Sequence, residues 1–127
     1  MFFIFYTGGL IIMNRLILLK WRNKRMTVDR DKICYIESYN RHLTVHTANQ
    51  TVEVVGKLSD IMSQLSDDFI CIHKSFVANM KYIIRIDENG VTMASGEILP
   101  VSVRRRSQVL SSFDSYCENV LATGEKK

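Results

Sequence analysis

The chain has 127 residues, which is enough for one domain with a modest hydrophobic core but not for two. Hydrophobic residues make up 46% of it and charged residues 24%, a globular composition that excludes a disordered chain. Lysine and arginine outnumber the acidic residues, 17 against 13, and the resulting net charge of +4 favours an anionic partner.

The first 13 residues are strongly apolar but are interrupted by two glycines. A transmembrane helix needs about 20 mostly apolar residues, and a signal peptide carries its positive charges before the apolar part. We therefore predict residues 1–13 to be an N-terminal extension, either an extra strand or helix packed on the domain or a stretch that precedes a true start at Met13. The alternative is a membrane anchor through residues 1–19, with the cations that follow at its cytoplasmic end.

Strand-like segments dominate the next part of the chain. Apolar and β-branched residues alternate with polar ones between short polar turns, which is the pattern of antiparallel strands. Asn-Gly at 89–90 is a strong hairpin signal because glycine accepts a positive φ at little cost. The predicted strands and apolar runs cover residues 16–21, 25–28, 32–38, 43–47, 51–55, 69–72, 76–77, 82–86, 91–94 and 97–99.

Two segments have helical periodicity instead. Leu58, Ile61, Met62 and Leu65 recur at helical spacing, which predicts a mid-chain helix with its apolar face in the core. Ser102 is a plausible N-cap for a last helix, whose apolar stripe would comprise Val109, Leu110, Phe113, Tyr116, Cys117 and Val120. We expect one mostly-β domain over residues 14–118, followed by a tail at 119–127.

Cysteine and histidine give no sign of a metal site, a cofactor or an enzyme. Cys34, Cys71 and Cys117 are an odd number at wide spacing, which favours small buried hydrophobes in a reducing cytosol, with a redox-sensing thiol as the alternative. The histidines share no metal-ligand spacing with them. No motif places a nucleophile beside a base, and there is no glycine-rich phosphate loop.

Three polar loops carry cations beside short hydrogen-bonding residues, at 39–42, 73–75 and 102–106. If the strands run side by side, these loops form one basic edge. Lysine, arginine and hydroxyl groups on such an edge bind phosphates, and arginine or lysine reads guanine in the major groove. Three successive arginines at a helix start oppose the helix dipole, which favours contact with a partner over simple solvation.

Two residues near these loops have a structural alternative. His73 follows an apolar strand, and it either contacts DNA or is hydrogen-bonded within the fold. Asn79 either contacts DNA or binds its own backbone in a turn.

Three patches of the chain, in order, resemble the LytTR DNA-binding domain of bacterial transcription regulators. The central one, 69–83, reads Phe-x-x-Ile-His-Lys-Ser-Phe-x-x-Asn-x-x-Tyr-Ile. The others are Asp-x-Ile-x-Tyr-Ile-Glu at 31–37 and Pro-Val-Ser-Val-Arg at 100–104. Two positions depart from the family pattern. Lys74 stands where arginine is more frequent, which keeps the charge but loses the planar fork, and Val103 is inserted before Arg104.

This resemblance implies a mostly-β fold, an elongated arrangement of small antiparallel sheets with one mid-chain helix and a C-terminal helix. It implies that loops, not a recognition helix, enter successive major grooves. Arg41 or His42, Lys74 and Arg104 then fall where the family contacts bases, and the others support them or touch the backbone. The predicted DNA-binding residues are Asn40, Arg41, His42, His73, Lys74, Ser75, Asn79, Ser102, Arg104 and Arg105.

The family also implies a partner and a setting. We expect double-stranded DNA, bound by two protomers on paired direct repeats, and a cytoplasmic transcription regulator of the response-regulator type. Too few residues precede position 16 for the receiver domain that such regulators often carry. The alternative function is a membrane-tethered or protein-interaction module that uses the apolar N-terminus.

Overall fold

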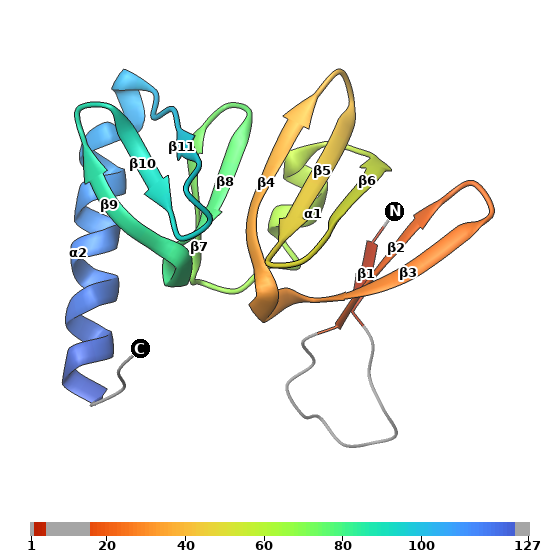
Figure 1. Ribbon diagram of the computed structural model, residues 1–127, viewed down its shortest axis with the longest axis horizontal. Helices are drawn as coiled ribbons and strands as arrows, with labels where there is room; N and C mark the ends of the chain where they lie inside the picture. Colours follow the sequence, from red (N-terminus) through yellow and green to blue (C-terminus); the bar gives the residue numbers. More distant parts are fainter. Residues whose placement is uncertain (1, 5–15, 124–127) are drawn as a thin grey trace.

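The computed structural model describes residues 2–4 and 16–123, which form three antiparallel sheets and two α-helices (Figure 1). The first sheet has the order β1-β2-β3, the second β6-β5-β4-β8-β7 and the third β11-β10-β9. The strands are β1 (Phe2–Ile4), β2 (Leu16–Trp21), β3 (Lys24–Asp29), β4 (Ile33–Tyr39), β5 (His42–Thr47), β6 (Thr51–Val55), β7 (Phe69–His73), β8 (Phe76–Asn79), β9 (Ile83–Asp87), β10 (Gly90–Met93) and β11 (Ile98–Leu99). The helices are α1 (Leu58–Met62) and α2 (Arg106–Thr123), and three short 3₁₀ helices are η1 (Arg30–Lys32), η2 (Met80–Tyr82) and η3 (Val103–Arg105).

The sheets follow one another along the long axis of the molecule. The β1-β2-β3 sheet lies at one end, the five-stranded sheet lies in the middle, and the third sheet with α2 lies at the other end (Figure 1). The mostly-β fold and the elongated arrangement of small sheets are therefore confirmed.

Two hydrophobic cores hold this arrangement together. Buried residues alternate with half-buried ones in β5 and with exposed ones in β6, so that Leu43, Val45, Val52 and Val54 all face the first core. Burying a valine or leucine side chain of this kind stabilises the fold by about 1.5–3 kcal/mol. The first core also receives Ile17, Leu19 and Val28 from the β2–β3 hairpin, and Ile61 from α1. The second core lies under α2 and contains Ile72, Ala78, Val91, Met93, Leu99 and Val109.

Both helices differ from their predicted limits. The mid-chain helix ends at Met62, although Leu65 still packs against the first core from the turn that follows. The last helix begins at Arg106 after the 3₁₀ turn η3 and runs to Thr123, beyond the predicted domain end at 118. Val109, Phe113 and Tyr116 belong to the second core, whereas Leu110, predicted in the same stripe, is 37% exposed and is not part of that core.

Gly90 at the β9–β10 turn is required for a close approach as well as for its backbone conformation. Its φ is +127°, and a Cβ at this position would lie 2.2 Å from the carbonyl oxygen of Leu99. Only glycine lets β11 come this near to the hairpin. The predicted hairpin at Asn89-Gly90 is therefore confirmed, and the positive φ falls on the glycine.

The predicted N-terminal extension lies largely outside the described residues. Within it, β1 pairs antiparallel with β2, with Phe3 opposite Leu18, so part of the segment forms an extra strand. Among the residues that the structure describes, no helix is long and apolar enough to cross a membrane.

Candidate nucleic-acid interface

The three predicted loops come together at one edge of the molecule, which we call the turn edge: residues 40–42, 73–75 and 102–105. The turns of β4–β5 and β7–β8 and the 3₁₀ helix η3 all lie on the upper side of Figure 1. Two backbone hydrogen bonds join them. The Ser38 amide donates to the Ser75 carbonyl at 2.8 Å, and the Ser102 amide donates to the Ile72 carbonyl at 3.0 Å. The spacing between the three segments is thus set by the main chain.

The first segment is a two-residue turn. Asn40 has a φ of +52° and Arg41 a φ of +65°, and positive φ at both central residues is the signature of the type I′ turn that suits the strand twist. The Gly56 amide donates to the Arg41 carbonyl at 2.9 Å and holds the turn against the end of β6. Both side chains are exposed. The loop predicted at 39–42 is therefore shorter, because Tyr39 and His42 belong to the strands.

The second segment is the turn at Lys74 and Ser75. Lys74 is exposed, while His73 and Ser75 are half-buried. The Ser75 amide donates to Nδ1 of His73 at 3.1 Å, and the ring of Phe76 meets the His73 ring edge-on at 5.9 Å between centroids. The imidazole is therefore oriented by the turn that it precedes.

His42 and His73 hold opposite tautomers in their neutral forms. Nδ1 of His73 accepts a hydrogen bond, so its Nε2 carries the proton and is a donor. Nδ1 of His42 lies 3.0 Å from the Asn40 carbonyl, which can only accept, so this nitrogen donates and Nε2 is an acceptor. A donor suits phosphate oxygens or guanine, and an acceptor suits the amino groups of adenine or cytosine.

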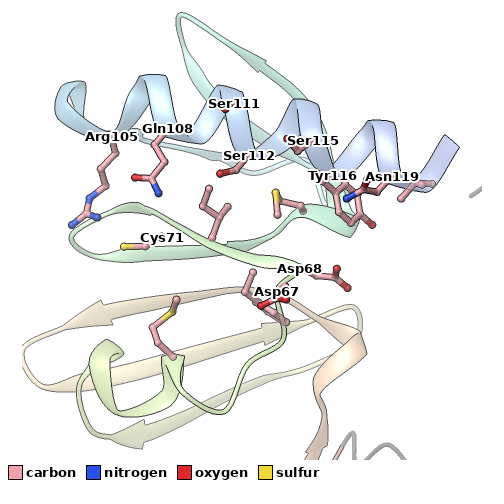
Figure 2. Close-up of a pocket in the computed structure, with 15 residues that line it drawn as sticks. Asp67, Asp68, Cys71, Arg105, Gln108, Ser111, Ser112, Ser115, Tyr116 and Asn119 are labelled. Carbon is pink, nitrogen blue, oxygen red and sulfur yellow. The ribbon is translucent and has the colours of Figure 1, made fainter. Parts of the chain in front are cut away.

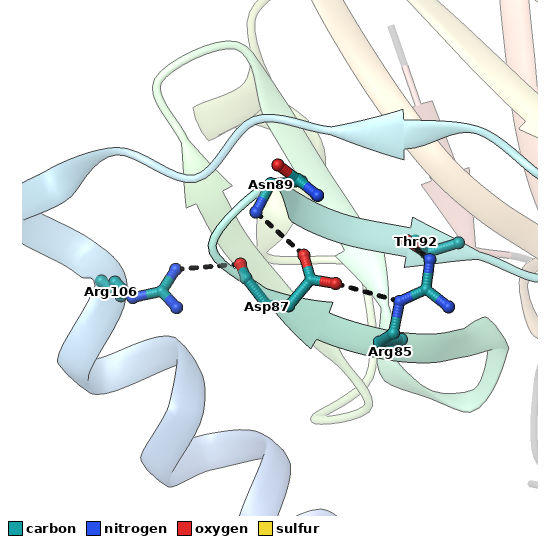
Figure 3. Close-up of polar contacts among 5 residues, drawn as sticks. All are labelled: Arg85, Asp87, Asn89, Thr92 and Arg106. Atoms are coloured by element: carbon teal, nitrogen blue, oxygen red, sulfur yellow. Dashed lines mark hydrogen bonds and ion pairs between the residues drawn. The ribbon is translucent and has the colours of Figure 1, made fainter.

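The third segment, from Ser102 to Arg106, gives its arginines different surroundings. Arg104 is exposed on η3. Arg105 lines a groove of about 740 Å³ between α2 and β7, where it lies near the α2 start (Figure 2). Arg106 donates from a guanidinium nitrogen to the Asp87 carbonyl at 3.3 Å and so fixes the start of α2 to the β9–β10 hairpin, whose turn is held by Arg85 and Asn89 (Figure 3).

The predicted N-cap at Ser102 is only partly present. Ser102 occupies the cap position of η3 with extended backbone angles, but its hydroxyl makes no capping hydrogen bond. Its Oγ is buried and has no hydrogen-bond partner among the described residues. Ser102 is thus joined to the turn edge through its backbone amide, and the predicted side-chain cap is absent.

Asn79 is a correction to the predicted site. It is 1% exposed, its Nδ2 donates to the Ile33 carbonyl at 2.9 Å, and its Oδ1 accepts from the Lys81 amide at 3.0 Å. These bonds use its side chain within the fold, at the end of β8 opposite the turn. The side chain is thus used as the structural alternative predicted, and it is not exposed at the surface where DNA would bind.

Sequence reasoning missed two apolar residues on the turn edge. Tyr39 is 74% exposed beside the first turn, and Val103 is 93% exposed between Ser102 and Arg104. The family pattern identifies Val103 only as an insertion, and the surrounding sequence does not indicate that its side chain faces outward. Apolar side chains beside cations suit the thymine methyl groups that line the major groove.

A stacked pair lies on the sheet face below the first turn. The rings of Tyr35 and His46 stack at 4.1 Å between centroids, and Nε2 of His46 lies 3.8 Å from Oε1 of Glu37. Burial lowers the pKa of His46, although Glu37 and Glu97 oppose the shift. Burial, reinforced by the same carboxylates, raises the pKa of Tyr35 to about 12.

The thiols show no paired or clustered arrangement. All three cysteines are free, and burial raises the pKa of Cys34. The thiol of Cys71 donates to the His73 carbonyl at 3.3 Å. Within residues 2–4 and 16–123, no group of histidine, cysteine and acidic residues could hold a metal ion.

The structure is a mostly-β domain that gathers exposed cations on linked turns at one edge. Comparison with known proteins gives the family. The LytTr DNA-binding domain matches residues 23–113, more than half of the chain, and the protein therefore belongs to the LytTR family. DNA binding in transcription regulation is the function of this family's domain, and it applies to this chain at that level.

A solved structure agrees with this assignment. The LytTr DNA-binding domain of a Bacillus cereus protein, described as a methyl-accepting/DNA response regulator, is 25% identical in sequence, with a TM-score of 0.62. The alignment covers 85% of this chain and 97% of that one. The comparison with curated proteins found no match.

Proposed function

We propose that this protein is a sequence-specific reader of double-stranded DNA that inserts the turn edge into the major groove. The observation that carries the proposal is the pair of backbone hydrogen bonds, from Ser38 to Ser75 and from Ser102 to Ile72, that joins three cation-bearing segments at one edge. Strands in a hairpin lie about 4.8 Å apart, and the major groove, about 12 Å wide, admits a two-stranded ribbon. The turns at 40–41 and 74–75 meet that requirement.

Each segment supplies a different kind of contact in this proposal. Arg104 and Arg41 are exposed guanidinium groups, which bind O6 and N7 of guanine with two hydrogen bonds. Lys74 supplies a point charge for a phosphate or a single base contact. His73, with its Nε2–H held in place by the Ser75 amide, donates to a phosphate or to a guanine acceptor.

Two protomers on a direct repeat complete the proposal. The elongated domain has its turn edge along one side, so copies can follow one another along the duplex with the same orientation. The family resemblance points to paired direct repeats, and a head-to-tail arrangement of this kind needs no two-fold axis.

Selection of bound duplexes from a random pool, with the full chain, tests the proposal. We expect an enriched direct repeat, and a duplex with two repeats should bind two protomers in sedimentation or native mass measurements. Salt-sensitive binding without an enriched sequence would contradict base reading. An enriched single site that binds one protomer would contradict the direct-repeat part alone.

A further inference from the structure

The β2–β3 hairpin carries a group of cations that the turn edge does not use. Lys20, Arg22, Lys24 and Arg25 gather at its turn, and Arg22, Lys24 and Arg25 are all exposed. All of β2 precedes the residues that the LytTR family matches, which begin at 23, whereas β3 with Lys24 and Arg25 lies within them.

The strand register and the turn bring these cations close together. In the β2–β3 register Lys20 lies directly opposite Arg25, and like charges at facing positions of two antiparallel strands repel each other. Arg22 has a φ of +58°, a left-handed conformation that is unfavourable for a residue with a side chain. The hairpin therefore concentrates positive charge at its turn.

The hairpin holds its cations firmly and directs them outward. Ile17, Leu19 and Val28 are buried in the first core and anchor its base, while the turn projects beyond the last core residue. Each strand residue adds about 3.3 Å, so the turn reaches well past the sheet. Figure 1 shows this turn at the end of the molecule remote from α2, directed to the same side as the β4–β5 turn.

We infer that the β2–β3 hairpin binds the phosphate backbone of the duplex beyond the bases read by the turn edge, with Arg22, Lys24 and Arg25 as the contacting residues. This inference rests on the proposed function. The partner follows from charge and continuity: the patch is cationic, it extends the row of turns, and a duplex lying along that row presents phosphates at its end. Such contacts add affinity without sequence preference.

The salt dependence of binding tests the inference. For a duplex that carries the selected site, the variant Lys24→Gln/Arg25→Gln should lower the slope of log K against log salt by about 1.8, since each phosphate contact contributes about 0.9. The ratio of the wild-type binding constant to that of the variant should then fall about 12-fold between 50 and 200 mM salt. Base preference should stay unchanged.

A matched control removes the same charge from the opposite edge. Lys32 and Lys81 are both exposed, on η1 and η2 at the ends of the strands away from the turns, and Lys32→Gln/Lys81→Gln should leave the slope close to that of the wild type. Equal slopes for the two double variants would overturn the inference, because the effect would then follow net charge and not position.

Neutral methylphosphonate linkages give a second test, which changes single phosphates of the DNA. Placed one at a time in the flanks of the site, they should weaken the wild-type chain at a few positions on one side and should not weaken the Lys24→Gln/Arg25→Gln variant there. No sensitive flank would overturn the inference while leaving the proposed function intact. A wild-type chain with no specific site would overturn the proposed function and this inference with it.

An anionic membrane is the competing partner for such a patch. Binding to vesicles of equal phosphatidylserine and phosphatidylcholine that is lost in the hairpin variant, together with an unchanged DNA salt slope, would overturn the inference in favour of a membrane surface.

Discussion

The turn edge and the opposite edge of the molecule are built on different hydrogen bonds. At the turn edge, backbone groups join the segments and the side chains of Arg41, Lys74 and Arg104 are exposed. At the opposite edge, side chains make the joins: Nδ2 of Asn79 donates to the Ile33 carbonyl, and the Tyr82 hydroxyl donates to the Asp31 carbonyl, both at 2.9 Å.

The opposite edge also repeats one local structure. Asp29 and Asn79 each accept a hydrogen bond from the amide two residues later, a 3₁₀ turn follows, and an isoleucine begins the next strand. The two connections are then tied to each other through Asn79 and Tyr82. The opposite edge thus uses its polar side chains for hydrogen bonds within the fold, whereas the turn edge leaves its cations exposed.

Asn79→Ala tests the stabilising edge and has the largest expected effect. It removes two hydrogen bonds from a side chain that is 1% exposed, so the free energy of unfolding should fall by about 2–3 kcal/mol. Denaturant unfolding measures the change. Asn89→Ala, at an exposed turn residue whose side chain makes no such bond, should stay within about 0.5 kcal/mol. A folded Asn79→Ala variant with an altered preference among DNA sequences would contradict the purely structural role of Asn79.

Arg104→Ala and Lys74→Ala test the turn edge through DNA affinity and base preference. Loss of a base-reading arginine should cost about 1–3 kcal/mol of binding and relax preference at one position. Loss of a phosphate-binding lysine should weaken all sequences alike and lower the salt slope by about one unit. Binding titrations on single-base variants of the site separate the two. Equal weakening on every sequence by Arg104→Ala would refute its role in base reading.

Arg41→Gly and Arg41→Ala separate the turn from its side chain. Arg41 has a φ of +65°, which glycine adopts freely and alanine does not, so the alanine variant should be less stable than the glycine variant by about 1 kcal/mol. Both remove the guanidinium group and should weaken DNA binding equally. Thermal unfolding together with titration checks this. Binding that follows stability instead would show that the turn conformation, and not the side chain, makes the contact.

His46 makes stability depend on pH, with the smallest effect of these predictions. Because its pKa in the folded protein is below its ordinary value of 6.5, the unfolded chain takes up a proton first as the pH falls below about 6.5. The free energy of unfolding should then decrease, by at most about 1.4 kcal/mol per pH unit, until the folded pKa is reached. His46→Phe keeps the stack on Tyr35 and should lose this dependence in unfolding measured between pH 7.5 and 5.5. An unchanged pH profile would exclude His46 as its source.

Local sequence signals predicted most of the strands but not how the loops and helix ends are used. The alternation in 43–47 and 51–55 and the Asn-Gly at 89–90 have short-range physical causes, so those elements were predicted correctly. The backbone bond of Ser102 and the buried position of Asn79 depend on partners that are 30 and 46 residues away in the sequence, respectively. No window of sequence contains both members of such a pair.

The candidate site shows the same division. The three cation-bearing segments were found from composition, and the family motifs placed them in order. Arg106 was grouped with Arg104 because the sequence cannot show that its guanidinium reaches the Asp87 carbonyl. Val103, 93% exposed, was overlooked because an apolar residue is expected inside.

The main-chain ties of the turn edge bear on how such a protein diverges. The bonds from Ser38 to Ser75 and from Ser102 to Ile72 use only backbone groups, which every residue except proline supplies on both sides. Side chains at 41, 74 and 104 can therefore change without moving the frame that carries them. Under the proposed function, a lineage of copies would acquire new target sites one residue at a time, and a designer would recode the same three positions on a fixed scaffold.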